Sequence, residues 1–270
     1  MDAHLIMVAI VGAWLVIAAA VFVGLFFVTA PYGRHVRGGW GPTLPNRYGW
    51  LVMEAPAALV FLAGFAVGPH NGSVTAWVFL AMWETHYVYR AFVYPFTLQD
   101  DGRRMPLSVV GMALAFNTVN AGLNSWWLFD LSGGYLNAWL ADPRFLAGIA
   151  LFVAGMAANR RSDATLRELR ASSVSDTSGP HGPVSLPAEA ASRYRIPEGG
   201  FYRWVSCPNY LGEMVEWIGW AIATWSLPGL AFAVWTVANL VPRARAHHEW
   251  YRRHFTDYPA ERKTLIPGIW

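Results

Sequence analysis

An uncharged run from Leu5 to Ala30 limits what this chain can fold into. A helix over this run is long enough to cross the hydrocarbon core of a bilayer with some tilt. A secretory signal peptide would need a basic segment followed by a shorter apolar core, but only Asp2 and His4 supply polar side chains before the run. The run therefore predicts a transmembrane helix, and the chain is expected to be an integral membrane protein.

Six further apolar segments follow, at roughly 48–68, 74–98, 107–130, 144–159, 209–225 and 227–242. Hydrophobic residues make up 55% of the 270 positions and charged residues only 14%, well below the quarter that is usual in soluble domains. The pattern predicts an all-α fold, a single-domain bundle of seven transmembrane helices over residues 1–270, with no internal repeat of the kind found in many transporters. The segment 171–191 is rich in Ser, Pro, Gly and Ala, which predicts a flexible loop.

Arginine and lysine fall on one side of the predicted bundle, and this asymmetry indicates its orientation. They follow the first and third spans, occupy the polar segment 160–208 and crowd the C-terminal tail, whereas only Arg144 falls on the other side. An odd number of spans then places the N-terminus outside and the C-terminus in the cytoplasm. We expect a multi-pass protein of a bacterial inner membrane or the endoplasmic reticulum, in contact with lipid. The net charge of +3 gives no reason to expect nucleic acid as a partner.

Ionisable side chains inside apolar spans are energetically costly, so they mark candidate functional positions. Glu54 lies near the predicted cytoplasmic start of the second span, close to Pro56, which can kink a helix. Tyr87 and Arg90 are spaced i, i+3 on the third span and share a helix face. The alternatives are a Glu54 carboxylate that reaches the membrane interface, and a purely structural Arg–carboxylate pair for Arg90.

Three rows of polar residues fall at the cytoplasmic ends of the later spans. At helical spacing they are Asn159, Asp163, Arg167 and Arg170; Asn209, Glu213, Glu216 and Trp217; and Arg243, His247 and Tyr251. Their convergence on an arginine-rich membrane face predicts a site for a polyanionic ligand, because guanidinium groups bind phosphate bidentately. The sequence has neither a Rossmann glycine motif nor a P-loop to hold a nucleotide, and no HExxH or cysteine cluster predicts a metal. The only lysine, Lys263, lies in the tail, so seven spans do not imply a retinal Schiff base.

The C-terminal part of the chain carries several long motifs in order. They are Tyr194-Arg195-Ile196-Pro197, Gly199-Gly200-Phe201, NYLGEMVEWIGWAIATWSLPGLAFA from Asn209, HHEWY from His247 and DYPAERKTLIP from Asp257. Upstream are Tyr32-Gly33-Arg34-His35, Trp50 to Pro56, HYVYRAFVY from His86, the GRRMP turn at Gly102 to Pro106, and Asn159 to Arg170. Through these motifs the chain resembles the steroid 5α-reductases (3-oxo-5α-steroid 4-dehydrogenases) over nearly its whole length, apart from the first helix and the loop 171–191.

The resemblance implies seven transmembrane helices and NADPH-dependent reduction of the C4–C5 double bond of 3-oxo-Δ4 steroids. It implies that Glu54 and Tyr87 are catalytic and bind the C3 carbonyl oxygen of the substrate. NADPH would be bound by Tyr32, Trp50, Arg103, Asn159, Asp163, Arg170, Tyr194, Arg195, Asn209, Glu213, Arg243, His247 and Tyr251. The steroid pocket would be lined by Met53, Phe116, Trp217 and Leu240. Family members often carry Gln in place of Met53, so an amide hydrogen bond near the carbonyl is absent here and the substrate preference stays open.

The implied reaction has a clear physical requirement. A conjugated enone accepts hydride at its β carbon only if the developing enolate oxygen is stabilised, and a protonated Glu54 and the Tyr87 hydroxyl are expected to donate hydrogen bonds to it. The steroid or sterol-like enone would enter from the lipid and NADPH from the cytoplasmic side, while the sequence does not identify the donor of the C4 proton. The alternatives are a related enoyl or sterol double-bond reductase, an isoprenylcysteine-type methyltransferase, and a non-catalytic lipid-binding or receptor-like protein.

Overall fold

The computed structural model describes residues 2–98, 102–175 and 194–270. Its long helices are α1 (Ala3–Phe27), α2 (Asn46–Val67), α3 (Val74–Val88), α5 (Leu107–Trp126), α6 (Pro143–Ser175), α8 (Pro208–Thr224) and α9 (Leu227–His254). The shorter elements are α4 (Tyr94–Thr97), the π-helical turns Tyr89–Val93 and Trp127–Leu131, the 3-10 turns Gly33–His35, Asn137–Ala141 and Gly200–Arg203, and the strands β1 (Thr43–Pro45) and β2 (Arg104–Pro106).

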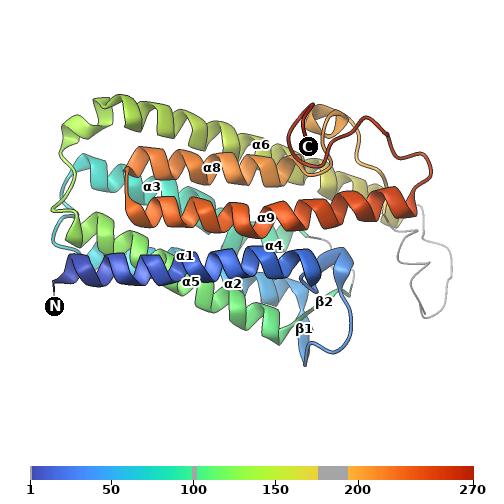
Figure 1. Cartoon of the computed structure of the whole chain (residues 1–270), viewed down its shortest axis with the longest axis horizontal. Helices are drawn as coiled ribbons and strands as arrows, with labels where there is room; N and C mark the ends of the chain where they lie inside the picture. Colours follow the sequence, from blue (N-terminus) through green and yellow to red (C-terminus); the bar gives the residue numbers. More distant parts are fainter. Residues whose placement is uncertain (1, 99–101, 176–193) are drawn as a thin grey trace.

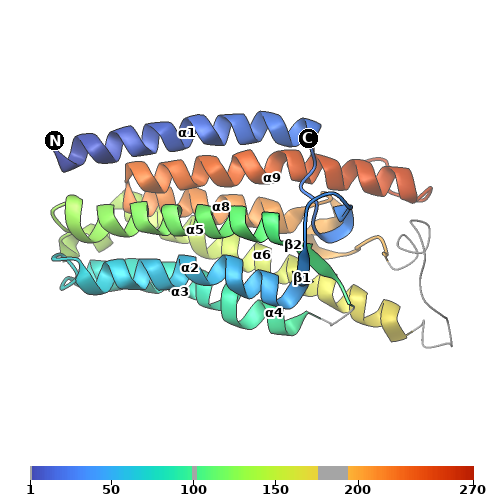
Figure 2. The same cartoon turned by 90° about the horizontal axis from the view of Figure 1, so that it is seen from below.

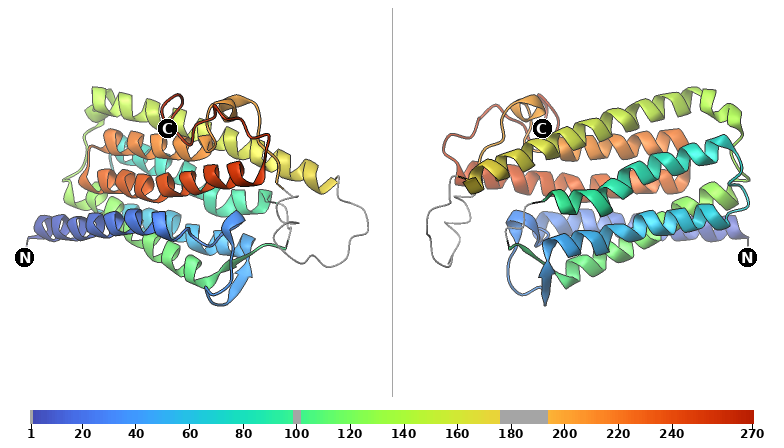
Figure 3. Two further views of the ribbon diagram at one scale, coloured as in Figure 1. Left: turned by 45° about the vertical axis from the view of Figure 1, so that its right-hand side comes forward. Right: turned by 180° about the vertical axis from the view of Figure 1, so that it is seen from behind.

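The long helices lie side by side along one axis, as Figures 1 and 2 show. Helix α6 packs against α8, α8 forms a hairpin with α9, and α2 packs against α3 and α5. Helix α1 lies at the edge of the bundle against α9 (Figure 3). The two strands, the C-terminal segment and the far ends of α6 and α9 gather at the end of the bundle opposite the N-terminus. Polar and aromatic residues from distant parts of the sequence therefore meet at this end.

Strands β1 and β2 form an antiparallel pair that fixes the starts of α2 and α5. Thr43 pairs with Pro106 and Pro45 with Arg104, and both prolines come directly before a helix. The Arg104 side chain strengthens the pair by donating from Nε to the Thr43 hydroxyl at 2.8 Å. Three-residue strands that contain proline give little strand signal, so the sequence did not predict this pair. Its effect is to begin α2 and α5 side by side, so that they stay in contact along their length.

The predicted all-α fold is confirmed, and each of the seven predicted segments is helical, with several corrected boundaries. The first helix ends at Phe27 rather than Ala30, and the third segment is α3 and α4 joined by a π-helical turn. The fifth helix does not end at 159 but continues to Ser175, so the predicted loop 171–191 begins too early. Most of that loop, residues 176–193, lies outside the described residues. Among the described helices, α1 and α2 are long and apolar enough to span a membrane by length and composition.

Glycines bring α6 and α8 into backbone contact. Gly148 and Gly155 on α6 face α8, and Gly212 and Gly219 on α8 face α6. A Cβ atom at any of these four positions would lie under 3.0 Å from backbone atoms of the other helix, a distance that real Cβ contacts essentially never show. Small residues at helix interfaces permit such close approach in membrane bundles. The contact fixes the position of each helix along the axis of the other.

An aromatic core fills the bundle beside these helices. Trp83, Trp217 and Trp220 are fully buried, and the Phe61 ring stacks on Trp83 with a centroid distance of 4.4 Å. The Trp83 indole donates to the Ala57 carbonyl at 2.9 Å, and the Trp220 indole donates to the Asn124 side chain at 3.0 Å. The indole N–H groups of Trp83 and Trp220 thus have partners, so their burial in this dense packing carries no penalty for an unsatisfied donor.

Gly155→Ala should destabilise the protein by about 1–3 kcal/mol, because the added methyl group meets the backbone of α8 and cannot be relieved by a rotamer change. Thermal unfolding of the purified protein measures the effect. The matched control is Gly111→Ala on α5, where nothing lies within 4 Å of the added atom, and its melting temperature should be unchanged or slightly higher. Equal melting temperatures for the two variants would contradict the close contact between α6 and α8.

Candidate active site

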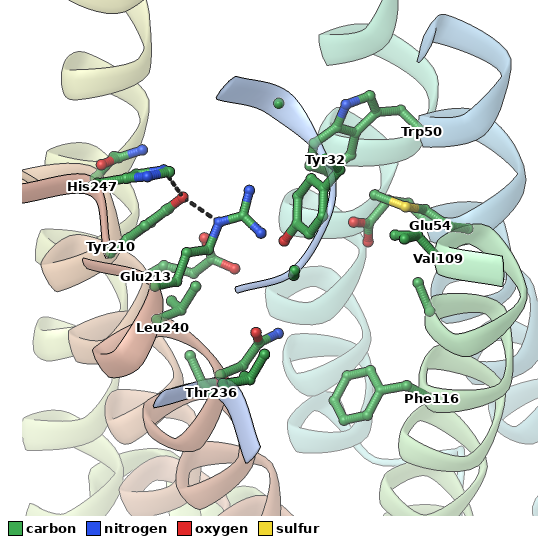
Figure 4. Close-up of a pocket in the computed structure, with 18 of the residues that line it drawn as sticks. Tyr32, Trp50, Glu54, Val109, Phe116, Tyr210, Glu213, Thr236, Leu240 and His247 are labelled. Atoms are coloured by element: carbon green, nitrogen blue, oxygen red, sulfur yellow. Dashed lines mark hydrogen bonds between the residues drawn. The ribbon is translucent and has the colours of Figure 1, made fainter. Parts of the chain in front are cut away.

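A cavity of about 810 Å³ lies inside the bundle, between α1, α2, α3, α5, α8 and α9. Its size is within the range of ligand sites in proteins. Apolar side chains such as Phe116, Phe232 and Trp235 line one part, and arginines and tyrosines line the other. In Figure 4, Glu54 lies at the transition, with Trp50 above it and Phe116 below it. The cavity can therefore accept a ligand with an apolar body at one end and a polar or charged ligand at the other.

Glu54 and Tyr87 both line this cavity, from α2 and α3. The Asn117 amide on α5 donates to Glu54 Oε2 at 3.3 Å and to the Met53 carbonyl at 2.6 Å, so α5 supports the segment that carries Glu54. Tyr87 is 3% exposed, with its ring 5.0 Å from that of Trp83 and 5.6 Å from that of Trp217. These contacts hold the side chains of Glu54 and Tyr87, both able to form hydrogen bonds, on the lining of the same cavity.

Arg90 lies in the π-helical turn after α3 and links three helices. Its guanidinium is 3.3 Å from Asp163 on α6 and 4.0 Å from Glu213 on α8, and it lies over the Trp50 ring at 4.7 Å. π-Helical turns are frequent at functional sites, and here the turn ends two residues before Pro95, which cannot donate a backbone hydrogen bond. The structural pair that the sequence left open for Arg90 exists, and Arg90 also lines the cavity.

Arg34 lies in an aromatic cluster at the polar mouth of the cavity. Its guanidinium is 4.5 Å from the centroid of the Tyr251 ring, 4.9 Å from Trp250 and 5.1 Å from Tyr194. The guanidinium of Arg103 lies 5.3 Å from the centroid of the Tyr194 ring, which belongs to the same cluster. Stacking leaves the edge of a guanidinium available for anions. Arg34 Nη1 is buried and has no hydrogen-bond partner among the described residues.

A chain of hydrogen bonds runs from Arg243 through Tyr210 and His247 to His35 (Figure 4 shows its first links). Arg243 Nε donates to the Tyr210 hydroxyl at 2.7 Å, and this hydroxyl shares a hydrogen bond with His247 Nε2 at 3.0 Å. If the Tyr210 hydroxyl donates to His247 Nε2, His247 carries its proton on Nδ1 and donates to His35 Nε2 at 2.8 Å; the reverse direction reverses both tautomers. The two histidine tautomers are therefore coupled, because the proton between the rings can belong to only one of them.

His35 and His247, the two histidines joined by these hydrogen bonds, are neutral at physiological pH. Burial, together with the guanidiniums of Arg243, Arg34 and Arg37, lowers the pKa of His35 to about 4. Burial and the nearby arginines, with Arg34 first, also lower the pKa of His247 well below its usual value. The guanidinium of Arg243 completes the cluster by lying 3.4 Å from the centroid of the Tyr32 ring, with its Nη1 buried and unpartnered in the described part of the chain.

Comparison with known proteins decides the family. The family model for 3-oxo-5-alpha-steroid 4-dehydrogenase matches residues 103–270. A steroid 5-alpha-reductase DET2 from Gossypium hirsutum is 39% identical, over 94% of this chain and 94% of its own length. The 3-oxo-5-alpha-steroid 4-dehydrogenase 1 of Bos taurus is 41% identical over 92% of this chain and 91% of its own, and that of Homo sapiens is 38% identical over 94% and 91%. The chain belongs to the steroid 5-alpha-reductase family.

The resemblance seen in the sequence is thus confirmed for this 5-alpha-reductase family member, and most of the predicted site residues converge on one cavity. Those that line it are Tyr32, Trp50, Met53, Glu54, Tyr87, Arg103, Phe116, Asp163, Arg170, Tyr194, Asn209, Glu213, Trp217, Leu240, Arg243, His247 and Tyr251. Asn159 lies behind this wall and donates to the Asn209 carbonyl at 3.0 Å and toward Glu213 at 3.4 Å. Arg195 lines a small adjoining recess with Arg170 and Tyr194. Their roles in binding stay predictions.

Several residues of the site were not assigned a role from the sequence, among them Arg34, Tyr210 and Asn117. Arg34 belongs to the motif Tyr32-Gly33-Arg34-His35, and Tyr210 directly follows Asn209. Both therefore lie next to residues that the sequence did assign to the site. Asn117 is a lone amide in an apolar segment, and its importance appears only when α5 packs on α2. Helix α1 also contributes Trp14, although the sequence predicted it only as a membrane span.

Between about pH 7 and about pH 5, acidification should decrease the contribution of His35 to the stability of the folded protein. Unfolded His35 regains its usual pKa of about 6.5 and binds a proton in this range, whereas folded His35, with a pKa of about 4, does not. At His35 the unfolded state therefore binds more protons, and the contribution of this residue to the free energy of unfolding decreases as the pH falls. His35→Gln should flatten this dependence in a pH series of thermal melts. His254→Gln, at an exposed histidine, should keep the wild-type slope, and an unflattened slope in His35→Gln would refute the assignment to His35.

Proposed function

We propose that this protein is a membrane-embedded, NADPH-dependent reductase of the C4–C5 double bond of 3-oxo-Δ4 steroids. Relatives that share about two fifths of their residues with it are named for this class of reaction. The observation that carries the proposal is the position of Glu54 and Tyr87, on a cavity that is apolar on one side and rich in arginine on the other. A steroid would fill the apolar part with its 3-oxo group toward these two residues.

The arginine-lined part of the cavity has the chemistry to hold NADPH. Arg34 Nη1 and Arg243 Nη1 are buried on this lining and lack partners among the described residues, a costly state that phosphate oxygens would relieve. The neutral histidines beside them leave the positive charge to the arginines. Asp163, Asn209 and Glu213 add polar groups on the same wall. These residues support the choice of a phosphate-bearing cofactor.

When bound, NADPH supplies the hydride that C5 of the steroid accepts. The protein has to stabilise the negative charge that then develops on the C3 oxygen. Tyr87 can donate its hydroxyl proton to that oxygen, and so can Glu54 in its protonated form, as preorganised donors in a site sheltered from water. Asn117 keeps Glu54 in place, while Phe116, Trp217 and Leu240 would pack on the steroid rings. Met53 contributes its thioether where an amide is common in the family.

The exposed apolar surface supports embedding in a bilayer. Helix α1 buries only Met7, Val11 and Ala18, while side chains such as Leu5 and Val16 are 63% and 70% exposed. An apolar face of this length is stable when lipid covers it. We infer seven spans with the N-terminus outside and the C-terminus in the cytoplasm. NADPH would then enter at the arginine-rich cytoplasmic end, and the steroid would enter from the lipid.

Glu54→Gln and Tyr87→Phe should each lower the turnover of a 3-oxo-Δ4 steroid by about 10²-fold or more, because each removes or weakens a donor to the developing oxyanion. NADPH binding should be largely unchanged in both. The measurement is NADPH oxidation by the purified protein with a panel of enones, with the saturated product identified by mass spectrometry. If Glu54→Ala reduced the steroid at the normal rate, the role of Glu54 would be wrong.

Arg243→Gln should weaken NADPH binding by about tenfold or more, because it removes a buried charge-assisted donor. The measurement is the rise in melting temperature that NADPH causes, relative to each variant without cofactor. Arg245→Gln is the matched control, since Arg245 has a side chain 54% exposed and pairs with Glu249 on the surface. NADPH protection of Arg243→Gln equal to that of Arg245→Gln would contradict the proposed cofactor site, and protection by S-adenosylmethionine instead would indicate a methyltransferase.

A further inference from the structure

A buried His–Glu pair lies beside the proposed catalytic residues and has no part in the mechanism so far. His86 on α3 is 7% exposed and lines the cavity, and its Nδ1 is 2.8 Å from Oε1 of Glu216 on α8. Glu216 is fully buried, and its Oε2 has no hydrogen-bond partner among the described residues. A buried carboxylate with one histidine contact is an expensive way to join two helices, since apolar side chains of the same volume would do so without the desolvation cost.

The pair has the arrangement that acid–base catalysis uses. With Nδ1 bound to Glu216, the nitrogen that His86 can offer to a ligand is Nε2. A carboxylate on the far side of an imidazole fixes its orientation and stabilises the imidazolium form. The His86 ring lies 4.9 Å from that of Tyr87 and 4.7 Å from that of Trp217, both of which line the same cavity. His86 is therefore a direct neighbour of the group that would bind the C3 oxygen.

We propose that His86, held by Glu216, donates the proton that C4 of the steroid receives. The inference rests on the proposed function. C4 is bonded to C3, so a substrate whose C3 oxygen meets Tyr87 brings C4 next to the residues in contact with Tyr87. His86 is in such contact and lines the cavity.

The ionisable side chains that line the cavity together with His86 include four that are committed elsewhere. Arg90 is held by Asp163 and Glu213, and a guanidinium is too basic to release a proton. Glu213 also receives a contact from Asn159 at 3.4 Å. Glu54 and Tyr87 are assigned to the carbonyl oxygen, to which they donate hydrogen bonds while keeping their protons, so the proton for C4 comes from another group. His86 is the remaining donor with a carboxylate behind it.

The step balances in atoms and electrons. Transfer of hydride, two electrons and a proton, to C5 leaves an enolate shared by the C3 oxygen and C4. The enolate electron pair at C4 forms a C–H bond with the proton of His86 Nε2, while the C3 carbonyl reforms. The N–H electron pair stays on Nε2, which leaves neutral His86 with its Nδ1 proton directed at Glu216. Water takes no direct part, and one proton from solvent restores the imidazolium before the next turnover.

Microscopic reversibility gives a test that needs no hydride transfer. In D2O without NADPH, neutral His86 should remove a C4 proton from the saturated 3-oxo-5α-steroid and return a deuteron, while Tyr87 and Glu54 polarise the carbonyl. Deuterium NMR measures the incorporation at C4 separately from that at C2. Wild-type protein should accelerate the C4 exchange above the rate in buffer, and His86→Gln should slow it by about 10²-fold or more. His254→Gln, the same substitution at an exposed histidine, should exchange at the wild-type rate.

A second variant separates chemistry from folding. The Gln side chain in His86→Gln can still donate to Glu216, so a structural role would be preserved while the acid is lost. If this variant does not fold, Glu216→Gln decides, because a neutral amide no longer stabilises the imidazolium and C4 exchange should fall by about tenfold or more. Wild-type exchange in a folded His86→Gln or Glu216→Gln protein would overturn the proposal.

The inference and the proposed function fail in different assays. A protein that oxidises NADPH with a 3-oxo-Δ4 steroid, yet exchanges C4 no faster than buffer does, refutes the role of His86 alone. A protein that oxidises no NADPH with any enone refutes the proposed reaction, and the role of His86 with it.

Discussion

The backbone contact between α6 and α8 is the constraint on which the polar end of this molecule depends. With hydrogen atoms alone between the helices at Gly155 and Gly212, Asn159 can reach the backbone of Asn209, and Asn209 donates to Asp163 at 3.1 Å. Side chains of ordinary size would separate these partners. The small residues of the interface are thus what allows a group of buried polar side chains to satisfy one another rather than stay unpaired.

This contact also fixes the third helix of the site. Arg90 reaches across from the π-helical turn after α3 to acids on both α6 and α8, so the position of that turn depends on the register of the two helices. Tyr87 lies three residues before Arg90, at the same end of α3. On the opposite wall, the pairing of β1 with β2 begins α2 and α5 together, and Asn117 holds the segment around Glu54. Two independent devices therefore bring Glu54 and Tyr87 to one cavity.

Much of this arrangement could be predicted from the sequence, for reasons that are local. Apolar runs located the helices, and the helical spacing of Asn159 with Asp163 and of Arg243 with His247 placed these residues on common faces. The end of α6 was wrong because hydropathy marks where a helix leaves an apolar environment, not where its hydrogen bonds stop. Contacts between distant residues had no such signal: Arg34 meets a tyrosine 217 positions away. Packing alone creates those pairs.

The chain of hydrogen bonds from Arg243 to His35 has a consequence for how this protein would behave in a living cell. Histidine is ordinarily the side chain whose charge responds to small changes in acidity. Here burial among arginines keeps both rings uncharged. The two histidines therefore add no charge to this face when the acidity of the surrounding compartment drifts, and its positive charge is carried by guanidinium groups that do not titrate.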